Sequence, residues 1–231
     1  MKLALLFRGP MRLEPHIHVA ILLQSYSMIS RLFSCDVEPF LLTYVGAAAN
    51  EVEDALGFAK INKIREPDEK HIDSLGEPGL YIPFANGGSR VNAYKQYYSM
   101  NNWVKDFRGN TFGCSHVFYA RTDVALDIPG TACWLNEDGY TTAHAKTVDD
   151  ISWTCDYVGA APTDIFCDAW DFDSESHLLS AVLKANKGED PLDMILAQKG
   201  IKLYIAEMRF GGHLIRASSD LDVFWSGTSG G

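Results

Sequence analysis

The chain has 231 residues, 47% of them hydrophobic and 22% charged, and its formal net charge is -10. This length and composition are typical of one soluble α/β domain. A uniformly acidic chain argues against nucleic acid as the main partner, because phosphate backbones select Lys and Arg patches, whereas a nucleotide needs only a few local cations.

The cysteines are odd in number and scattered, with no Cys-x-x-Cys pair: Cys35, Cys114, Cys133, Cys155 and Cys167. This pattern indicates buried reduced thiols rather than a disulfide framework or a zinc motif. The first apolar stretch is too short for a secretory leader, and no apolar run approaches the length of a membrane span. We therefore expect a cytoplasmic protein without a membrane span.

The first half of the chain alternates predicted strands and helices. Apolar runs predict the strands, and apolar residues at helical spacing predict the helices. The segment 65–88 is rich in Pro, Gly, Asp and Glu, which indicates a surface loop. The expected elements are a strand at 2–7, a helix at 16–33, a strand at 37–45, a helix at 47–59 and a strand at 61–64.

The second half begins with a helix at 89–107, for which Ser89 is the expected N-cap. The remaining expected elements are strands at 117–120, 156–160 and 201–206, short extended pieces at 132–135 and 212–216, and helices at 175–187 and 191–200. Alternating strands and helices predict a mostly parallel sheet flanked by helices. We expect one domain over 1–226 and a flexible polar tail at 227–231.

The segment HVFYARTDVAL (116–126) carries charges where a buried strand ends. Arg121 and Asp123 alternate, so both side chains are expected on the same side of an extended segment. Ligands bind at the carboxyl ends of strands in open α/β sheets, and an Arg binds phosphate while an Asp holds a metal or a sugar hydroxyl. An internal Arg–Asp ion pair that closes the loop is the alternative.

Two further segments suit a phosphate group. Arg8, Gly9 and Arg12 follow the first strand, and Gly9 lets the backbone approach a ligand closely; the segment lacks the Lys-Ser/Thr pair of a P-loop. The helix from residue 89 carries Arg90, Asn92 and Lys95 at its start, where free amides favour an anion. A tight turn and an ordinary packing helix are the alternatives, and the tyrosines of this helix are expected in the core.

The segment TDIFCDAWDFD (163–173) interleaves Asp164, Asp168, Asp171 and Asp173 with aromatic residues. Carboxylates beside aromatic faces suit a sugar site, because the acid accepts hydroxyl protons and the ring covers the apolar sugar face. His213 follows two glycines and is either structural or part of a site.

Several segments, in this order, resemble GT-A-type glycosyltransferase-like proteins of polysaccharide-building gene sets and large viruses. They are KLALLFRGPMR, SRVNAYKQYYSMNNWVKDF, VFYARTDVAL, TDIFCDAW and EDPLDMILAQKGIKLYIAEMRFGGHLIR. The resemblance implies a GT-A-like (Rossmann-like) fold and transfer of a sugar from a nucleoside diphosphate sugar to a glycan or other hydroxyl acceptor.

By this resemblance Arg8, Gly9 and Arg12 would line the nucleotide pocket, and Asp164 or Asp168 would act as base toward the acceptor hydroxyl. Asp123 stands at the second acid of the family's Asp-x-Asp metal motif, whereas Arg121 replaces the first. Arg121 would then neutralise phosphate charge itself, or Mg²⁺ or Mn²⁺ would bind through Asp123 with help from His213. The alternatives are a non-catalytic nucleotide- or sugar-binding module of the same fold and a sugar nucleotidyltransferase.

Overall fold

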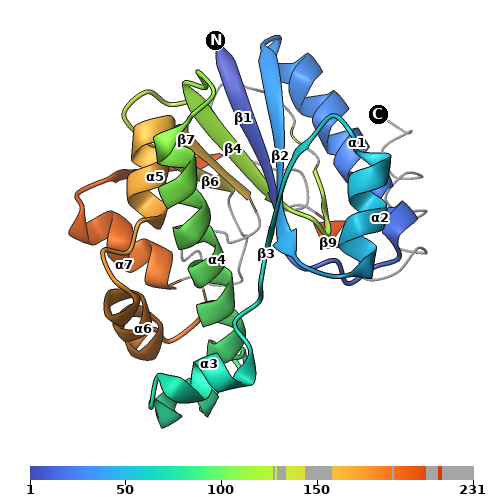
Figure 1. Ribbon diagram of the computed structural model, residues 1–231. Helices are drawn as coiled ribbons and strands as arrows, with labels where there is room; N and C mark the ends of the chain where they lie inside the picture. The colour runs from blue at the N-terminus through green and yellow to red at the C-terminus, as the bar shows by residue number, and fades with distance from the viewer. Residues whose placement is uncertain (127, 129–133, 144–157, 189, 207–212, 215–231) are drawn as a thin grey trace.

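The computed structural model describes residues 1–126, 128, 134–143, 158–188, 190–206 and 213–214. A seven-stranded sheet forms the centre, with the strand order β3-β2-β1-β4-β7-β6-β8 (Figure 1). The strands are β1 (Lys2–Arg8), β2 (Asp36–Tyr44), β3 (Lys60–Ile64), β4 (His116–Arg121), β6 (Gly139–Ala143), β7 (Val158–Pro162) and β8 (Lys202–Ala206). A separate pair joins β5 (Val124–Ala125) to β9 (His213–Leu214).

The sheet is mostly parallel, as expected: β7 alone among these seven strands runs antiparallel to its two neighbours, β4 and β6. Its residue pairs run from His116–Pro162 to Ala120–Val158. The end of β7 therefore lies beside the start of β4, at the edge opposite to the ends of β1, β2 and β4. This reversal decides where the acidic segment after β7 is placed.

Helices cover both faces of the sheet (Figure 1). One layer contains α1 (Pro15–Phe33) and α2 (Ala47–Ala55), and the other contains α4 (Arg90–Gly109), α5 (Thr163–Trp170), α6 (Glu175–Lys184) and α7 (Asp190–Gln198). Each layer packs on its own apolar cluster, because successive strand residues face opposite sides. Leu6 and Tyr119 belong to the α4 side, and Phe7 and Phe118 belong to the α1 side.

Local signals predicted the helix starts well. Ser89 caps α4, since its Oγ accepts from the Asn92 amide at 3.2 Å, and Ser174 caps α6 by accepting from the His177 amide at 3.1 Å. Tyr94 and Tyr97 on α4 are fully buried, as the core interpretation expected.

The elements in the structure differ from those expected in three places. The segment 65–88 is not a plain loop, because it forms α3 (Glu69–Ser74) and a 3-10 turn (Pro78–Tyr81). The segment TDIFCDAW is a helix, α5, with Phe166 and Trp170 buried on its apolar stripe. Strand β6 was missed because its residues, GYTTA, carry only a weak apolar signal.

Some expectations fall outside the described residues, including Cys133, Cys155 and the tail 227–231. Cys114 and Cys167 are free, buried thiols, as expected, whereas the free thiol of Cys35 is only half-buried. Within the described part of the chain, no helix is both long and apolar enough to span a membrane.

Candidate functional site

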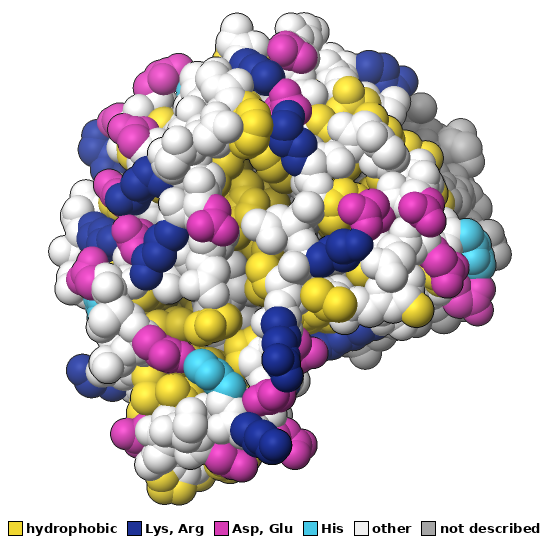
Figure 2. All heavy atoms as spheres, viewed as in Figure 1, with side chains coloured by type: hydrophobic (Ala, Val, Ile, Leu, Met, Phe, Trp, Pro, Cys, Tyr) yellow, Lys and Arg dark blue, Asp and Glu magenta, His cyan; other side chains and the backbone are white. Residues whose placement is uncertain are grey.

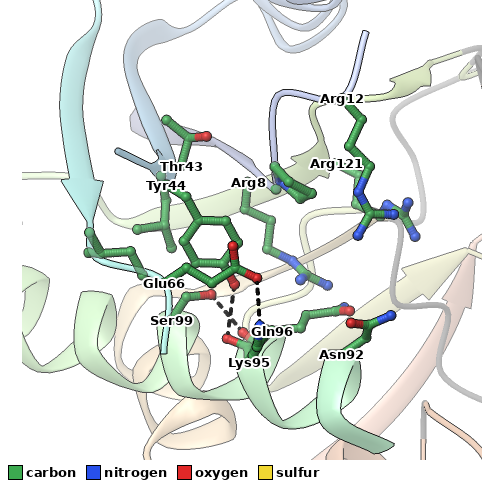
Figure 3. A pocket seen from close by; sticks show the side chains of 14 residues that line it. Arg8, Arg12, Thr43, Tyr44, Glu66, Asn92, Lys95, Gln96, Ser99 and Arg121 are labelled. Carbon is green, nitrogen blue, oxygen red and sulfur yellow. Dashed lines mark hydrogen bonds and ion pairs between the residues drawn. The ribbon is translucent and has the colours of Figure 1, made fainter. Parts of the chain in front are cut away.

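A cavity of about 200 Å³ lies at the carboxyl edge of the sheet, between the ends of β1, β2 and β4 and the first turns of α4 (Figure 3). Its lining comprises Arg8, Gly9, Pro10, Arg12, Leu42, Thr43, Tyr44, Ile64, Glu66, Asn92, Lys95, Gln96, Ser99 and Arg121. Six of the eight predicted donor-binding residues thus line it; Arg90 and Asp123 are not in the lining.

The parallel pairing of β1 and β4 brings two arginines together. Arg8 is the register partner of Arg121, and each is the last residue of its strand. Each also lies two residues beyond a side chain packed on the α4 side, Leu6 in β1 and Tyr119 in β4. Since side chains two apart share a face, both arginines extend toward α4 at the same level of the sheet (Figure 3).

Arg8 is buried, with 3% of its surface exposed. Its guanidinium carbon lies 5.1 Å from the centre of the Tyr119 ring and 5.2 Å from that of Trp170, which is cation–π geometry. A buried cation is costly unless negative charge or electron-rich groups compensate it. The Tyr119 and Trp170 rings supply such compensation, and Arg8 also lines the cavity, where an anion could add to it.

Arg121 and Asp123 form the internal pair that the sequence left as an alternative. Arg121 Nε lies 2.9 Å from Asp123 Oδ1, and Nη2 lies 2.7 Å from Oδ2. The pair is bidentate, and Asp123 is the less exposed partner. Arg121 nevertheless lines the cavity, so the pair is not sealed away from it.

The loop after β1 is held rigidly to the end of β4. The Thr122 amide donates to Arg8 O at 2.9 Å, and Thr122 Oγ1 donates to Pro10 O at 3.3 Å. Gly9 has a φ of 135°, and a Cβ built on it would lie 3.0 Å from Thr122 Oγ1. Glycine is required here, because other residues avoid this backbone conformation and this contact. The close approach that Gly9 allows in this structure is to Thr122, and the approach of a ligand to its backbone stays a prediction.

His18 on α1, which the sequence did not single out, also contacts the loop after β1 and the end of β4. Its ring is fully buried; Nδ1 donates to Thr122 O at 2.9 Å, and Nε2 accepts from the Leu13 amide at 3.1 Å. Acceptance by Nε2 requires the neutral ring, and burial lowers the pKa of His18 below its ordinary value. No sequence signal could reveal this role, since Thr122 lies 104 residues along the chain and only the fold brings it to His18.

Helix α4 supplies the opposite wall of the cavity. Lys95 Nζ pairs with Glu66 at 3.1 Å, and Tyr44 Oη donates to Lys95 O at 3.2 Å. Burial, with the nearby Glu66 charge, raises the pKa of Tyr44 to about 12 even though Arg8 and Arg12 act in the other direction. Tyr44 is therefore a neutral hydrogen-bonding side chain at ordinary pH.

The charge of the lining contrasts with that of the whole chain. Four cations, Arg8, Arg12, Lys95 and Arg121, face one acid, Glu66, in a protein whose net charge is -10. Elsewhere, on the face shown in Figure 2, acidic and basic side chains are interspersed. A local excess of cations at a strand-end cavity indicates a phosphate-bearing ligand.

Arg90 does not take part in this site, contrary to the expectation. Its Nη1 donates to Ile82 O at 2.9 Å, and its Nη2 donates to Ala185 O at 2.9 Å. The guanidinium also lies over the Phe84 ring. Arg90 therefore joins the segment before α4 to the end of α6, and its hydrogen bonds are structural.

Asp164 and Asp168 also lie away from the cavity. Because β7 runs antiparallel to β4, α5 begins beside Ser115, with the Thr163 amide donating to Ser115 O at 2.9 Å. The two acids lie in a separate depression at the opposite edge of the sheet, and Asp168 pairs with Arg108 at 2.7 Å. The structure thus does not bring the predicted catalytic acids to the predicted donor site.

His213 is described only by its backbone, which pairs with Ala125 two residues beyond Asp123; its side chain lies outside the described residues. The residues that sequence reasoning missed in the lining include Tyr44, Glu66, Gln96 and Ser99. Residues of these types occur throughout proteins, so only their convergence on one cavity identifies them as candidate site residues.

No family model and no curated protein matches the sequence. Among solved structures, a nucleotidyl transferase from Methanothermobacter thermautotroptrophicus is similar over 90% of this chain and 86% of that chain, with 14% sequence identity and a TM-score of 0.40. A likeness at this level assigns no activity. What the strand order and the two helical layers establish is an α/β fold with a seven-stranded, mostly parallel sheet and a cationic cavity at its carboxyl edge.

Proposed function

We propose that this protein is a nucleotide-dependent transferase that binds the phosphates of a nucleoside diphosphate sugar in the strand-end cavity and transfers the sugar to a hydroxyl acceptor. The observation that carries the proposal is the convergence of Arg8, Arg12 and Arg121 on one cavity of an acidic chain. Ligands of open α/β sheets bind at this edge.

The cavity volume limits how much of such a ligand is enclosed. At about 200 Å³ it is below the range of roughly 300–1,000 Å³ that is usual for small-molecule sites. It suits the diphosphate and part of the nucleoside, with the sugar and the acceptor at the open side. Asp164 and Asp168 have no part in the site proposed here, because they lie at the other edge of the sheet.

A sugar nucleotidyltransferase is the second candidate. The observation that favours it is the contribution of the loop after β1, since Gly9, Pro10 and Arg12 all line the cavity. Such enzymes carry a Gly-rich, cationic segment after the first strand that holds a nucleoside triphosphate.

Calorimetric titration with uridine, guanosine, thymidine and cytidine diphosphates tests the binding step. We expect one of them to bind the wild type, and Arg12→Gln to weaken that binding about tenfold or more, because a charge-assisted hydrogen bond contributes about 1.5–3 kcal/mol. Arg31→Gln is the matched control: Arg31 is an exposed arginine in the last turn of α1, just before the start of β2, whereas the cavity lies where β2 ends.

Product analysis then separates the candidates. Release of the nucleoside diphosphate from a nucleotide sugar in the presence of a glycan supports the glycosyltransferase. Pyrophosphate release from a nucleoside triphosphate and a sugar phosphate supports the nucleotidyltransferase, and binding without turnover supports the non-catalytic module. If no nucleotide binds, or if Arg12→Gln binds as well as Arg31→Gln, the cavity is not a phosphate site.

A further inference from the structure

We infer that the cavity holds the diphosphate through arginines and without a divalent cation; this rests on the proposed function. A GT-A-like site is expected to hold Mg²⁺ or Mn²⁺ through carboxylate oxygens. The described residues do not fit such a cation. Arg8 and Arg121 supply the positive charge that the cation would otherwise supply.

Asp123, the acid at the position of the metal motif, is already engaged. Both of its carboxylate oxygens accept from the Arg121 guanidinium, at 2.9 Å and 2.7 Å. A divalent cation bound to Asp123 would have to displace this bidentate contact or lie beside a fixed positive charge. In the Asp-x-Asp motif the first acid would be a second metal ligand. Arg121 stands at that position and places a positive charge there instead.

The acid in the cavity lining, Glu66, is also paired with a cation. Glu66 pairs with Lys95 at 3.1 Å on the α4 wall. Across the described residues, no group of three or more His, Cys, Asp or Glu side chains is arranged to hold a metal ion. The side chains around the cavity are thus suited to binding an anion rather than a metal ion.

The charge of the described side chains suits a diphosphate directly. The four lining cations exceed Glu66 and Asp123 by two positive charges. A diphosphate that links a nucleoside to a sugar carries roughly two negative charges, about one on each phosphate. Asp123 is then a positioning residue, because it fixes the plane of the Arg121 guanidinium beside the buried Arg8.

The test measures nucleoside diphosphate binding by calorimetry in excess EDTA and again in excess MnCl₂ or MgCl₂. We expect the dissociation constants to agree within about twofold, and Mn²⁺ titrated alone, followed by electron paramagnetic resonance, to show no tight site. Binding that requires the cation, or that tightens about tenfold or more with it, overturns this inference and leaves the proposed function intact. Failure to bind with and without the cation overturns both.

Two variants separate the arginine from the acid. Arg121→Gln is expected to weaken binding in EDTA about tenfold or more, because the guanidinium contacts the phosphate. Asp123→Asn is expected to weaken it by less, about two- to fivefold, equally with and without Mn²⁺, because the lost orientation of Arg121 is partly offset by the removal of one negative charge. A loss in Asp123→Asn that appears only in the Mn²⁺ titration identifies Asp123 as a metal ligand and overturns the inference. Circular dichroism of both variants confirms that the comparison is between folded proteins.

Discussion

The stability of the fold should decrease as His18 becomes protonated. His18 is neutral and fully buried, joining Thr122 O and the Leu13 amide at 2.9 Å and 3.1 Å. Its folded-state pKa lies below the ordinary value of 6.5, chiefly because of burial. As the pH falls below that value the unfolded chain takes up a proton on His18 and the folded chain does not, so the free energy of unfolding decreases.

The size of the effect follows from linkage. The slope from one such group reaches about 1.4 kcal/mol per pH unit. Between about pH 7.5 and about pH 5.5 the loss therefore reaches about 1.4 kcal/mol at most, for a folded-state pKa that stays below the lower pH. For a chain of this length the loss corresponds to a fall in Tm of about 3 to 5 °C.

Urea unfolding at the two pH values measures the effect, and His18→Gln isolates it. A glutamine amide supplies one donor group and one acceptor but does not titrate in this range. We expect the stability difference between wild type and His18→Gln to shift by about 1.4 kcal/mol in favour of the variant at the lower pH. His16→Gln, at an exposed site two residues away, should keep the wild-type pH dependence. Identical pH dependence in wild type and His18→Gln would refute the reasoning, and an NMR titration of His18 gives the same answer if that variant does not fold.

Two further predictions concern stability. Gly159→Ala should lower the free energy of unfolding by about 1–3 kcal/mol, because a Cβ would lie 2.6 Å from Tyr119 Cε1 and 2.8 Å from Tyr140 Oη. Urea unfolding measures the change, and Gly57→Ala is the control because the space around Gly57 is open. Ser89→Ala should lower the free energy of unfolding by about 1 kcal/mol, because the N-cap of α4 is lost. Ser176→Ala, within α6, removes no N-cap and should leave the stability unchanged. Equal Tm values for the two serine variants would contradict this.

The elements of the fold that depend on local signals were predicted from the sequence. Apolar runs located β1, β2 and β4, and helical spacing with a Ser cap located α4. The cationic end of β1 and that of β4 were also evident, because a charge that follows a buried strand is visible in the sequence alone. Parallel pairing then placed Arg8 beside Arg121.

What only the tertiary structure decided is the direction of β7, the partners of Arg90 and the position of His18. A strand has the same apolar pattern in either direction, so the pattern could not show that β7 is antiparallel and carries Asp164 to the far edge of the sheet. Arg90 and His18 each bond to a carbonyl group distant in sequence, Ala185 O and Thr122 O respectively. Backbone groups of this kind are present at every residue, so only the folded chain determines which of them a side chain meets.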